Sequence, residues 1–225
     1  MATVVSAKRE LRKRMKQILS GISDESISLQ SKHVFNHILA SKEYQESRTI
    51  ACYVSMPSGE IQTDSIIHAA LADGKALYVP RIVREPPTTD SKTQISYMQF
   101  YRIYDRDDYE RNLISGVWGI REPSPKFNDL PRSTVFDQGS RGLDLILMPG
   151  MAFDREMARL GHGKGYYDQF IAKYRLYAST NGWSKSNLVA LGLSEQIMEP
   201  GTIPMTEYDI HVDTLVTKGG FHTKD

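Results

Sequence analysis

Short apolar segments alternate with helical patterns along most of this 225-residue chain, and this alternation limits the folds that it can adopt. Apolar runs of strand length occur at residues 49–54, 76–80, 143–148, 188–193 and 210–217. Strands that are apolar throughout are typical of parallel sheets covered by helices on both faces. We therefore predict an α/β fold with a mainly parallel, open sheet and flanking helices.

Helical patterns fill several of the segments between these strands. Helices are predicted at residues 6–20, 23–40, 63–73 and 166–178, and the first of them is basic and amphipathic. Ser23 is suited to cap the second helix, because a serine hydroxyl accepts hydrogen bonds from the first free N–H groups. The pattern thus supplies enough helices to cover both faces of a sheet.

Three further segments are less regular. Residues 95–101 predict another strand, for which an antiparallel orientation is one option. The proline-containing segment 85–93 predicts a surface loop or an insertion, and 123–141 predicts a long irregular connection. No internal repeat or clear domain boundary separates these segments. We expect residues 1–225 to form a single domain with the basic helix at its N-terminal end.

Composition excludes several classes of protein. The formal net charge is +1, so no overall field draws the chain to nucleic acid or to acidic lipid. No apolar run has membrane-spanning length, and the first residues lack the apolar core of a secretory signal. The single cysteine, Cys52, excludes an intramolecular disulfide framework and is expected to be a small buried residue. We expect a cytoplasmic monomer without nucleic-acid or membrane partners.

The run from Arg159 to Asp168 is the strongest candidate for a binding site. Three glycines alternate with His162 and Lys164, and such a backbone can approach a ligand closely with its N–H groups turned inward. Lys164 adds a point charge, and a helix that begins at Tyr166 would direct its positive end at a phosphate. The run matches neither the Walker A pattern nor GxGxxG. A flexible turn before a helix is the alternative interpretation.

Other candidate residues surround this run in the predicted fold. Ligands bind beyond the carboxyl ends of parallel strands, where residues 56–62, 148–167 and 194–196 are expected to meet. Glu60 in the first of these segments could accept hydrogen bonds from an amino-substituted ring, or it could simply precede a helix.

Four charged residues, Lys8, Arg12, Asp168 and Asp209, have both a functional and a purely structural interpretation. Lys8 and Arg12 lie one helical turn apart and could clamp an anion, although a solvated helix face is the ordinary explanation. Asp168 in the first turn of its helix and Asp209 near the last strand could hold a metal ion. A helix-dipole charge and a turn charge would explain the same two residues.

Five elements, taken together and in order, resemble the 5-formyltetrahydrofolate cyclo-ligase family, also called methenyltetrahydrofolate synthetase. They are Lys8-Arg-Glu-Leu-Arg12, Glu60-Ile-Gln-Thr63, Met148-Pro-Gly150, the run from Arg159 to Asp168, and Asp209-Ile-His-Val-Asp213. The resemblance covers nearly the whole chain, and GHGKGYYD is its most specific part. It implies a fold similar to that of some sugar-phosphate isomerases and CoA transferases.

The resemblance also implies a reaction, in which 5-formyltetrahydrofolate is converted to 5,10-methenyltetrahydrofolate with ATP and Mg²⁺. It implies a catalytic role for Lys164, with magnesium at Asp168 and Asp209. Residues implied to bind ATP are Lys8, Arg9, Glu10, Leu11, Arg12, Arg159, Leu160, Gly161, His162, Gly163, Lys164, Gly165, Tyr166 and Tyr167. Residues implied to contact the folate are Val54, Glu60, His162, Gly163, Lys164, Gly165 and Tyr166.

Two departures from the family pattern concern the phosphate loop. His162 stands where the family usually has arginine, so a fixed charge is replaced by an imidazole. Met157-Ala158 replaces the usual Gly-Asn before the loop arginine. Two other hypotheses stay open from the residues alone: a sugar-phosphate isomerase or CoA transferase of the same architecture, and a protein that binds nucleotide or folate without catalysis.

Overall fold

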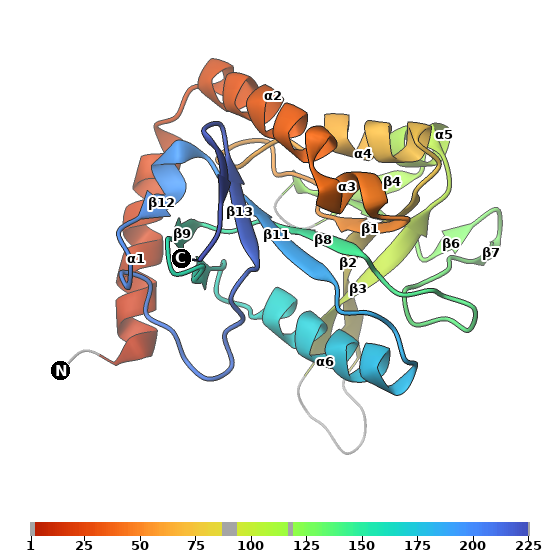
Figure 1. The fold of residues 1–225 in the computed structure, drawn as a ribbon. Coiled ribbons are helices and arrows are strands. Elements are labelled where there is room, and N and C mark those ends of the chain that lie inside the picture. The colour runs from red at the N-terminus through yellow and green to blue at the C-terminus, as the bar shows by residue number, and fades with distance from the viewer. Residues whose placement is uncertain (1–2, 87–93, 117–118, 225) are drawn as a thin grey trace.

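A seven-stranded sheet forms the centre of the computed structural model, which describes residues 3–86, 94–116 and 119–224 (Figure 1). Its strands are β1 (Thr49–Cys52), β2 (Ala76–Glu85), β3 (Ile95–Ile103), β8 (Leu145–Met148), β11 (Asn187–Leu191), β13 (Thr214–Thr217) and β14 (Gly220–His222). Their order is β14-β13-β11-β8-β1-β2-β3. The five inner strands are parallel, and β3 and β14 are antiparallel edge strands. The predicted α/β class is confirmed.

Helices cover both faces of this sheet (Figure 1). The helices α2 (Asp24–Ala40), α3 (Lys42–Glu46) and α4 (Asp64–Ala72) lie on one face, and α6 (Tyr166–Thr180) lies on the other. Because side chains alternate along a strand, Ile50 and Cys52 pack under the first group while Ala51 packs toward α6. The helix α1 (Val4–Ser20) buries Met15 and Leu19 in the first of these cores.

Smaller elements complete the structure around the sheet. They are α5 (Arg106–Arg111), β4 (Leu113–Ser115), β5 (Arg121–Pro123), β6 (Lys126–Phe127), β7 (Leu130–Pro131), β9 (Ala152–Asp154), β10 (Arg159–Leu160) and β12 (Ile197–Met198). The strands β9, β10 and β12 form a second, three-stranded sheet. The pairing of β9 with β10 matters most, because it carries the chain into the candidate phosphate loop.

Most predicted helices and strands are present in the structure. Their observed ends show where the local sequence predicted the boundary of an element correctly. Ser23 caps α2 by accepting a hydrogen bond from the Ser26 amide. The predicted irregular segment 85–93 is partly wrong, because β2 continues to Glu85; residues 87–93 lie outside the described part of the chain. Residues 95–101 do form an antiparallel strand, which pairs with β2 along its whole length.

The last predicted parallel strand is shorter than expected. Residues 210–217 were predicted to form it, but β13 begins at Thr214. The preceding backbone has other partners: the Ile210 amide donates to the Asp168 carboxylate, and the Val212 amide donates to the Met157 carbonyl. These contacts hold the Asp209 segment against the beginning of α6 instead of against a strand.

The connections of β1 and β8 define a crevice in the sheet. From β1 the chain continues to β2 and β3 on one side, and from β8 it continues to β11 and β13 on the other. The adjacent strands β1 and β8 therefore form the point at which the direction of winding reverses. In open α/β sheets, ligands bind beyond the carboxyl ends of the strands at such a point.

Candidate active site

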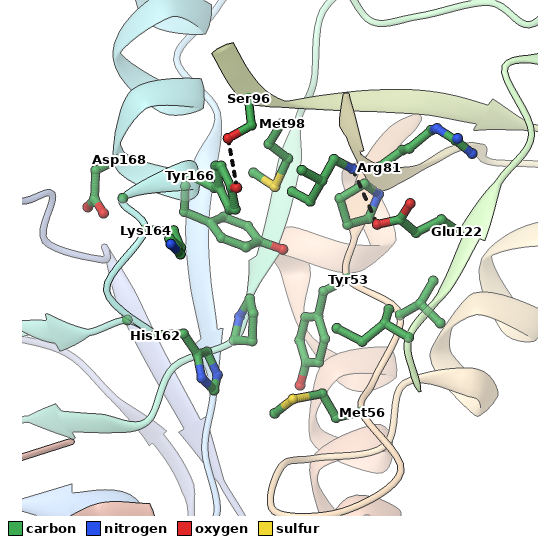
Figure 2. A pocket seen from close by; sticks show the side chains of 18 of the residues that line it. Tyr53, Met56, Arg81, Ser96, Met98, Glu122, His162, Lys164, Tyr166 and Asp168 are labelled. Atoms are coloured by element: carbon green, nitrogen blue, oxygen red, sulfur yellow. Dashed lines mark hydrogen bonds between the residues drawn. The ribbon is translucent and has the colours of Figure 1, made fainter. Parts of the chain in front are cut away.

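A cavity of about 320 Å³ opens at this crevice. Tyr53 and Val54 line it directly after β1, and Pro149 lines it directly after β8. The hairpin of β2 and β3 forms another wall, and the loop of residues 161–165 with the beginning of α6 closes a third side (Figure 2). The glycine loop that the sequence singled out thus lies at the edge of the sheet where ligands are expected.

The loop depends on glycine at two positions. Gly163 has φ +97°, and a Cβ atom there would lie 3.2 Å from the guanidinium carbon of Arg12. Gly165 has φ +66° and is the N-cap of α6 without a side-chain cap. Left-handed backbone at both positions is unfavourable for residues with a Cβ atom. The loop therefore delivers the uncapped N-terminus of a 15-residue helix to the cavity.

Arg159 anchors this helix start from inside the protein. Only 6% of Arg159 is exposed, and its Nη2 donates to both oxygens of Asp168 at 3.1 and 3.0 Å. Its Nη1 donates to the Pro149 carbonyl at the end of β8. The guanidinium also lies 5.5 Å from the centre of the Tyr167 ring. A fixed positive charge is thus buried directly beneath the loop.

The N-terminal helix contributes two basic side chains to the same place. Arg12 donates from Nε to the Gly161 carbonyl at 2.8 Å, and Lys8 forms an ion pair with Asp209. Burial acts against ionisation of Asp209, but hydrogen bonds from Lys8 and Thr206 outweigh it and hold the pKa of this carboxyl below its usual value. Residues 8–12, 159–168 and 209–210 therefore meet although they are far apart in the sequence.

Several members of the predicted ATP-binding set do not line the cavity. Lys8, Arg12 and Gly163 lie near it, at or beside the loop, and Leu160 is buried in the core. The side chains of Arg9 and Glu10 are 80% and 69% exposed, and Nε of Arg9 lies 3.9 Å from Oε1 of Glu10. Leu11 packs against the hydrophobic core below α1. Helical geometry explains the difference, because only residues three or four apart share a face, and Lys8 and Arg12 occupy the face that meets the loop.

The loop side chains lie at the mouth of the cavity. Lys164 is exposed and lies on the same side as Asp168, as Figure 2 shows. His162 also lines the cavity; desolvation and then the charges of Arg159 and Arg12 lower the pKa of its imidazole. A lowered pKa favours the neutral imidazole, so His162 does not supply the fixed positive charge that an arginine would supply.

A buried carboxylate lies at the floor of the cavity. The turn after Val54 includes Gly59 at φ +80° and folds back, so that the Met56 amide donates to Oε1 of Glu60. Glu60 is 4% exposed, and burial raises the pKa of its carboxyl to about 7 against the weaker effect of this hydrogen bond. Both Glu60 and Val54 line the cavity. A carboxyl group in this state can accept or donate a hydrogen bond near neutral pH.

Two buried donors line the same cavity without a protein acceptor. Among the described residues, neither the Tyr167 hydroxyl nor Nε of Arg159 has a hydrogen-bond partner. Burial raises the pKa of Tyr167 well above its ordinary value, so its hydroxyl stays protonated. Buried donors are rarely left unpaired in proteins, so these two atoms are exceptions among the described residues.

The sequence reasoning did not identify the wall formed by β2 and β3. Arg81, Ile82, Arg84, Ser96 and Met98 line the cavity, and so does Glu122 from β5. In the register of the hairpin, Ile82 lies opposite Met98, and Arg84 lies opposite Ser96. The alternation of 95–101 could have indicated one lined face, but only the pairing with β2 assigns that face to the cavity. A tryptophan such as Trp118 could stack on a planar ligand, but this residue lies outside the described part of the chain.

Comparison with known proteins agrees with the family resemblance of the five sequence elements. Residues 4–218 match the sequence profile of the 5-formyltetrahydrofolate cyclo-ligase family. The chain belongs to this family. A probable 5-formyltetrahydrofolate cyclo-ligase of Caenorhabditis elegans is 39% identical over 97% of this chain and 96% of its own length. The 5-formyltetrahydrofolate cyclo-ligase of Mus musculus is 32% identical over 95% of each chain.

A solved structure extends the agreement to the fold. The 5,10-methenyltetrahydrofolate synthetase of Aquifex aeolicus superimposes with a TM-score of 0.68 and 28% identity, covering 96% of this chain and 92% of that one. The family membership predicted from the sequence motifs is confirmed, and the cyclo-ligase family is a family of enzymes. In the described part of the chain, the structure has no helix that is both long and apolar enough to cross a bilayer.

Proposed function

We propose that this protein closes the ring of 5-formyltetrahydrofolate to give 5,10-methenyltetrahydrofolate, with ATP converted to ADP and phosphate. The convergence of Lys8, Arg12, Arg159 and Lys164 on the N-terminus of α6 carries this proposal. A helix N-terminus, glycine N–H groups and four cations form a site for a polyphosphate. The apolar part of the same cavity supports a planar ring system beside it.

The proposed chemistry requires positioning more than a nucleophilic side chain. The formyl oxygen attacks the γ-phosphate of ATP, and the bond from that phosphorus to the bridging oxygen of ADP breaks. The neighbouring amine nitrogen then attacks the activated carbon and loses its proton. The bond from that carbon to the former formyl oxygen breaks, so that the oxygen leaves with the phosphate, which takes up the proton. Lys164 at the open side of the loop would neutralise charge on the transferring phosphoryl group.

The donor set near the loop supports a magnesium ion that is held largely by phosphate. No three His, Cys, Asp or Glu side chains cluster as metal ligands within the described ranges. Asp168 lines the cavity, and the three hydrogen bonds that Asp209 accepts from described residues all end on Oδ2. Mg²⁺ commonly uses one or two carboxylates together with substrate phosphates, so Asp168 and Oδ1 of Asp209 would hold it. The ion would neutralise charge on the phosphates.

The floor of the cavity supports recognition of the folate ring. Glu60 can exchange hydrogen bonds with a ring that carries amino and N–H groups, and Val54 and Tyr53 provide apolar contact. Arg159 and Tyr167 line the cavity between this floor and the loop. This arrangement would bring the formyl oxygen to the same side as Lys164, where the phosphoryl transfer takes place.

An absorbance assay for the methenyl product tests the proposal. Protein, 5-formyltetrahydrofolate and Mg²⁺ are mixed with ATP and, as a control, without it. Product that depends on ATP, with one ADP released for each methenyl group, is the expected result. ATP binding without product would favour a binding protein, and turnover of a sugar phosphate or CoA ester without ATP would favour the other enzyme classes.

Assembly and location remain predictions of this proposal. A site built from one chain requires no second copy, so we expect a monomer by analytical ultracentrifugation. We also propose a cytoplasmic location, which imaging of the tagged full-length protein would check. The relative from Arabidopsis thaliana is a mitochondrial 5-formyltetrahydrofolate cyclo-ligase at 31% identity, so an organelle is the specific alternative for that experiment.

A further inference from the structure

The helix α1, at one side of the molecule (Figure 1), carries exposed cations that the contacts with the loop do not use. Lys13 and Lys16 are exposed, and the Arg9 side chain is 80% exposed. On a helix, residues three or four apart lie next to each other on one face. Arg9 and Lys16 are therefore the helical neighbours of Arg12, and Lys13 is a neighbour of both. We call Arg9, Arg12, Lys13 and Lys16 the α1 patch.

The protein hardly compensates the charges of the α1 patch. Arg9 lies 3.9 Å from Glu10, and both side chains are largely exposed. Within residues 3–86, 94–116 and 119–224, no carboxylate forms an ion pair with Lys13 or Lys16. Like charges at this spacing repel each other and weaken a helix. Because the net charge of the whole chain is only +1, the positive field at α1 is a local feature.

Arg12 connects the α1 patch to the phosphate loop. Its Nε donates to the Gly161 carbonyl, and a Cβ atom on Gly163 would lie 3.2 Å from its guanidinium carbon. Lys16 lies one helical turn beyond Arg12, which is a rise of about 6 Å along the axis. Neither Lys13 nor Lys16 lines the cavity. The patch therefore begins at the loop and continues over the exposed face of α1, within the distance over which charges act at moderate ionic strength.

We propose that Lys13 and Lys16, together with Arg9, attract the polyphosphate of the nucleotide from solution and direct it to the loop beside Arg12. This inference rests on the proposed function, which identifies the anion as a nucleoside triphosphate. A local field of one sign raises the rate at which an opposite charge arrives, and it needs no contact in the bound state. The two lysines therefore act on association, while the loop and the N-terminus of α6 determine dissociation.

Stopped-flow fluorescence with methylanthraniloyl-ATP and Mg²⁺, without folate, tests this inference. At an ionic strength of about 0.01 M, Lys13→Gln with Lys16→Gln should lower the association rate constant about fivefold. Lys13→Glu with Lys16→Glu doubles the change in charge, so the decrease should be about 25-fold. At about 1 M, where charges are screened within about 3 Å, both variants should associate as fast as the wild type. The dissociation rate constant should stay the same throughout.

Lys32→Gln with Lys218→Gln is the matched control, because it removes the same charge from exposed positions outside α1. Its association rate constant should stay within about twofold of the wild-type value. An equal decrease in this control would assign the effect to net charge, and no decrease in the α1 variants would show an ordinary solvated helix face. Faster dissociation of the α1 variants would mean that the lysines contact the bound nucleotide. Each of these three results would overturn the inference.

Failure of the proposed function would give a different result. Wild-type protein that binds methylanthraniloyl-ATP but forms no methenyl product would contradict the proposed reaction, and the association rates of the variants would still decide the role of Lys13 and Lys16. Folded wild-type protein that does not bind the nucleotide would overturn the inference as well.

Discussion

At the scale of single residues, Glu60 shows how burial prepares a group for recognition. Its carboxyl is 4% exposed, and the hydrogen bond from the Met56 amide offsets only part of the cost of burying a charge. Near neutral pH the side chain is divided between its neutral and ionised forms. The sequence indicated Glu60 as a residue beyond a strand end, but it could not indicate the burial that raises the pKa.

Glu60→Gln tests this state of the carboxyl through stability. The pKa of the Glu60 carboxyl is about 7 in the folded protein and 4.5 in the unfolded chain. Protonation of Glu60 therefore adds to the unfolding free energy fully below pH 4.5, and this added stability is lost as the pH rises through 7. The unfolding free energy of the wild type minus that of the variant should therefore fall by about 3 kcal/mol between pH 4.5 and 8. Urea unfolding across this range measures the difference. A difference independent of pH would contradict the raised pKa.

At the scale of elements, the loop and the beginning of α6 act together. Gly165 is a left-handed N-cap, and its geometry directs the first N–H groups of the helix at the cavity. The sequence predicted this helix start from the spacing of Tyr166 and the residues after it. It could not show that Arg12 contacts the loop or that Ile210 contacts the beginning of α6, because those contacts depend on how distant segments meet.

Comparing Gly165→Ala with a control glycine distinguishes the backbone strain of a left-handed residue from a role of the loop in phosphate binding. Gly74 has the same φ of +66° at the end of α4, where a Cβ atom would meet nothing within 4 Å, so Gly74→Ala is the matched control. Both substitutions should cost about 1 kcal/mol of unfolding free energy. Only Gly165→Ala should also raise KM for ATP, by about tenfold. Equal KM values in the two variants would mean that the helix N-terminus does not bind phosphate.

At the scale of the whole molecule, a buried ion pair joins segments on the side away from the phosphate loop. The side chains of Asp108 in α5 and of Arg132 are both 0% exposed and form two hydrogen bonds of 2.6 and 2.9 Å. Arg132 also donates to the carbonyls of Ser124 and Arg102. The pair therefore ties α5 to the end of β3 and to the irregular segment that follows β5.

Asp108→Ala should destabilise the protein by about 3–5 kcal/mol, because it leaves a buried guanidinium without its partner. Asp107→Ala on the same helix removes an exposed pair with Arg111 and should cost less than about 1 kcal/mol. Chemical denaturation gives both values. A double variant, Asp108→Leu with Arg132→Met, should recover part of the loss, and no recovery would show that the carbonyl contacts of Arg132 matter more than its charge.

The overall arrangement of helices and strands could be predicted from sequence patterns more fully than the lining of the cavity could. Apolar strands and amphipathic helices have local periodicity, so the parallel core, α2 and α6 were predictable. The pairing of β2 with β3 brings Arg84 to the cavity, and the packing of α5 against residues 124–132 buries Asp108 with Arg132. Both features depend on register and on long-range packing, which single segments do not encode.

The most direct test of the central claim is turnover by Lys164→Ala in the ATP-dependent absorbance assay. Lys164 is exposed, so the variant should unfold at the wild-type temperature while its kcat falls by about 100-fold or more. Lys32→Ala, an exposed lysine of α2, should keep both properties. Turnover near that of the wild type from folded Lys164→Ala protein would contradict the assignment of phosphoryl transfer to this loop.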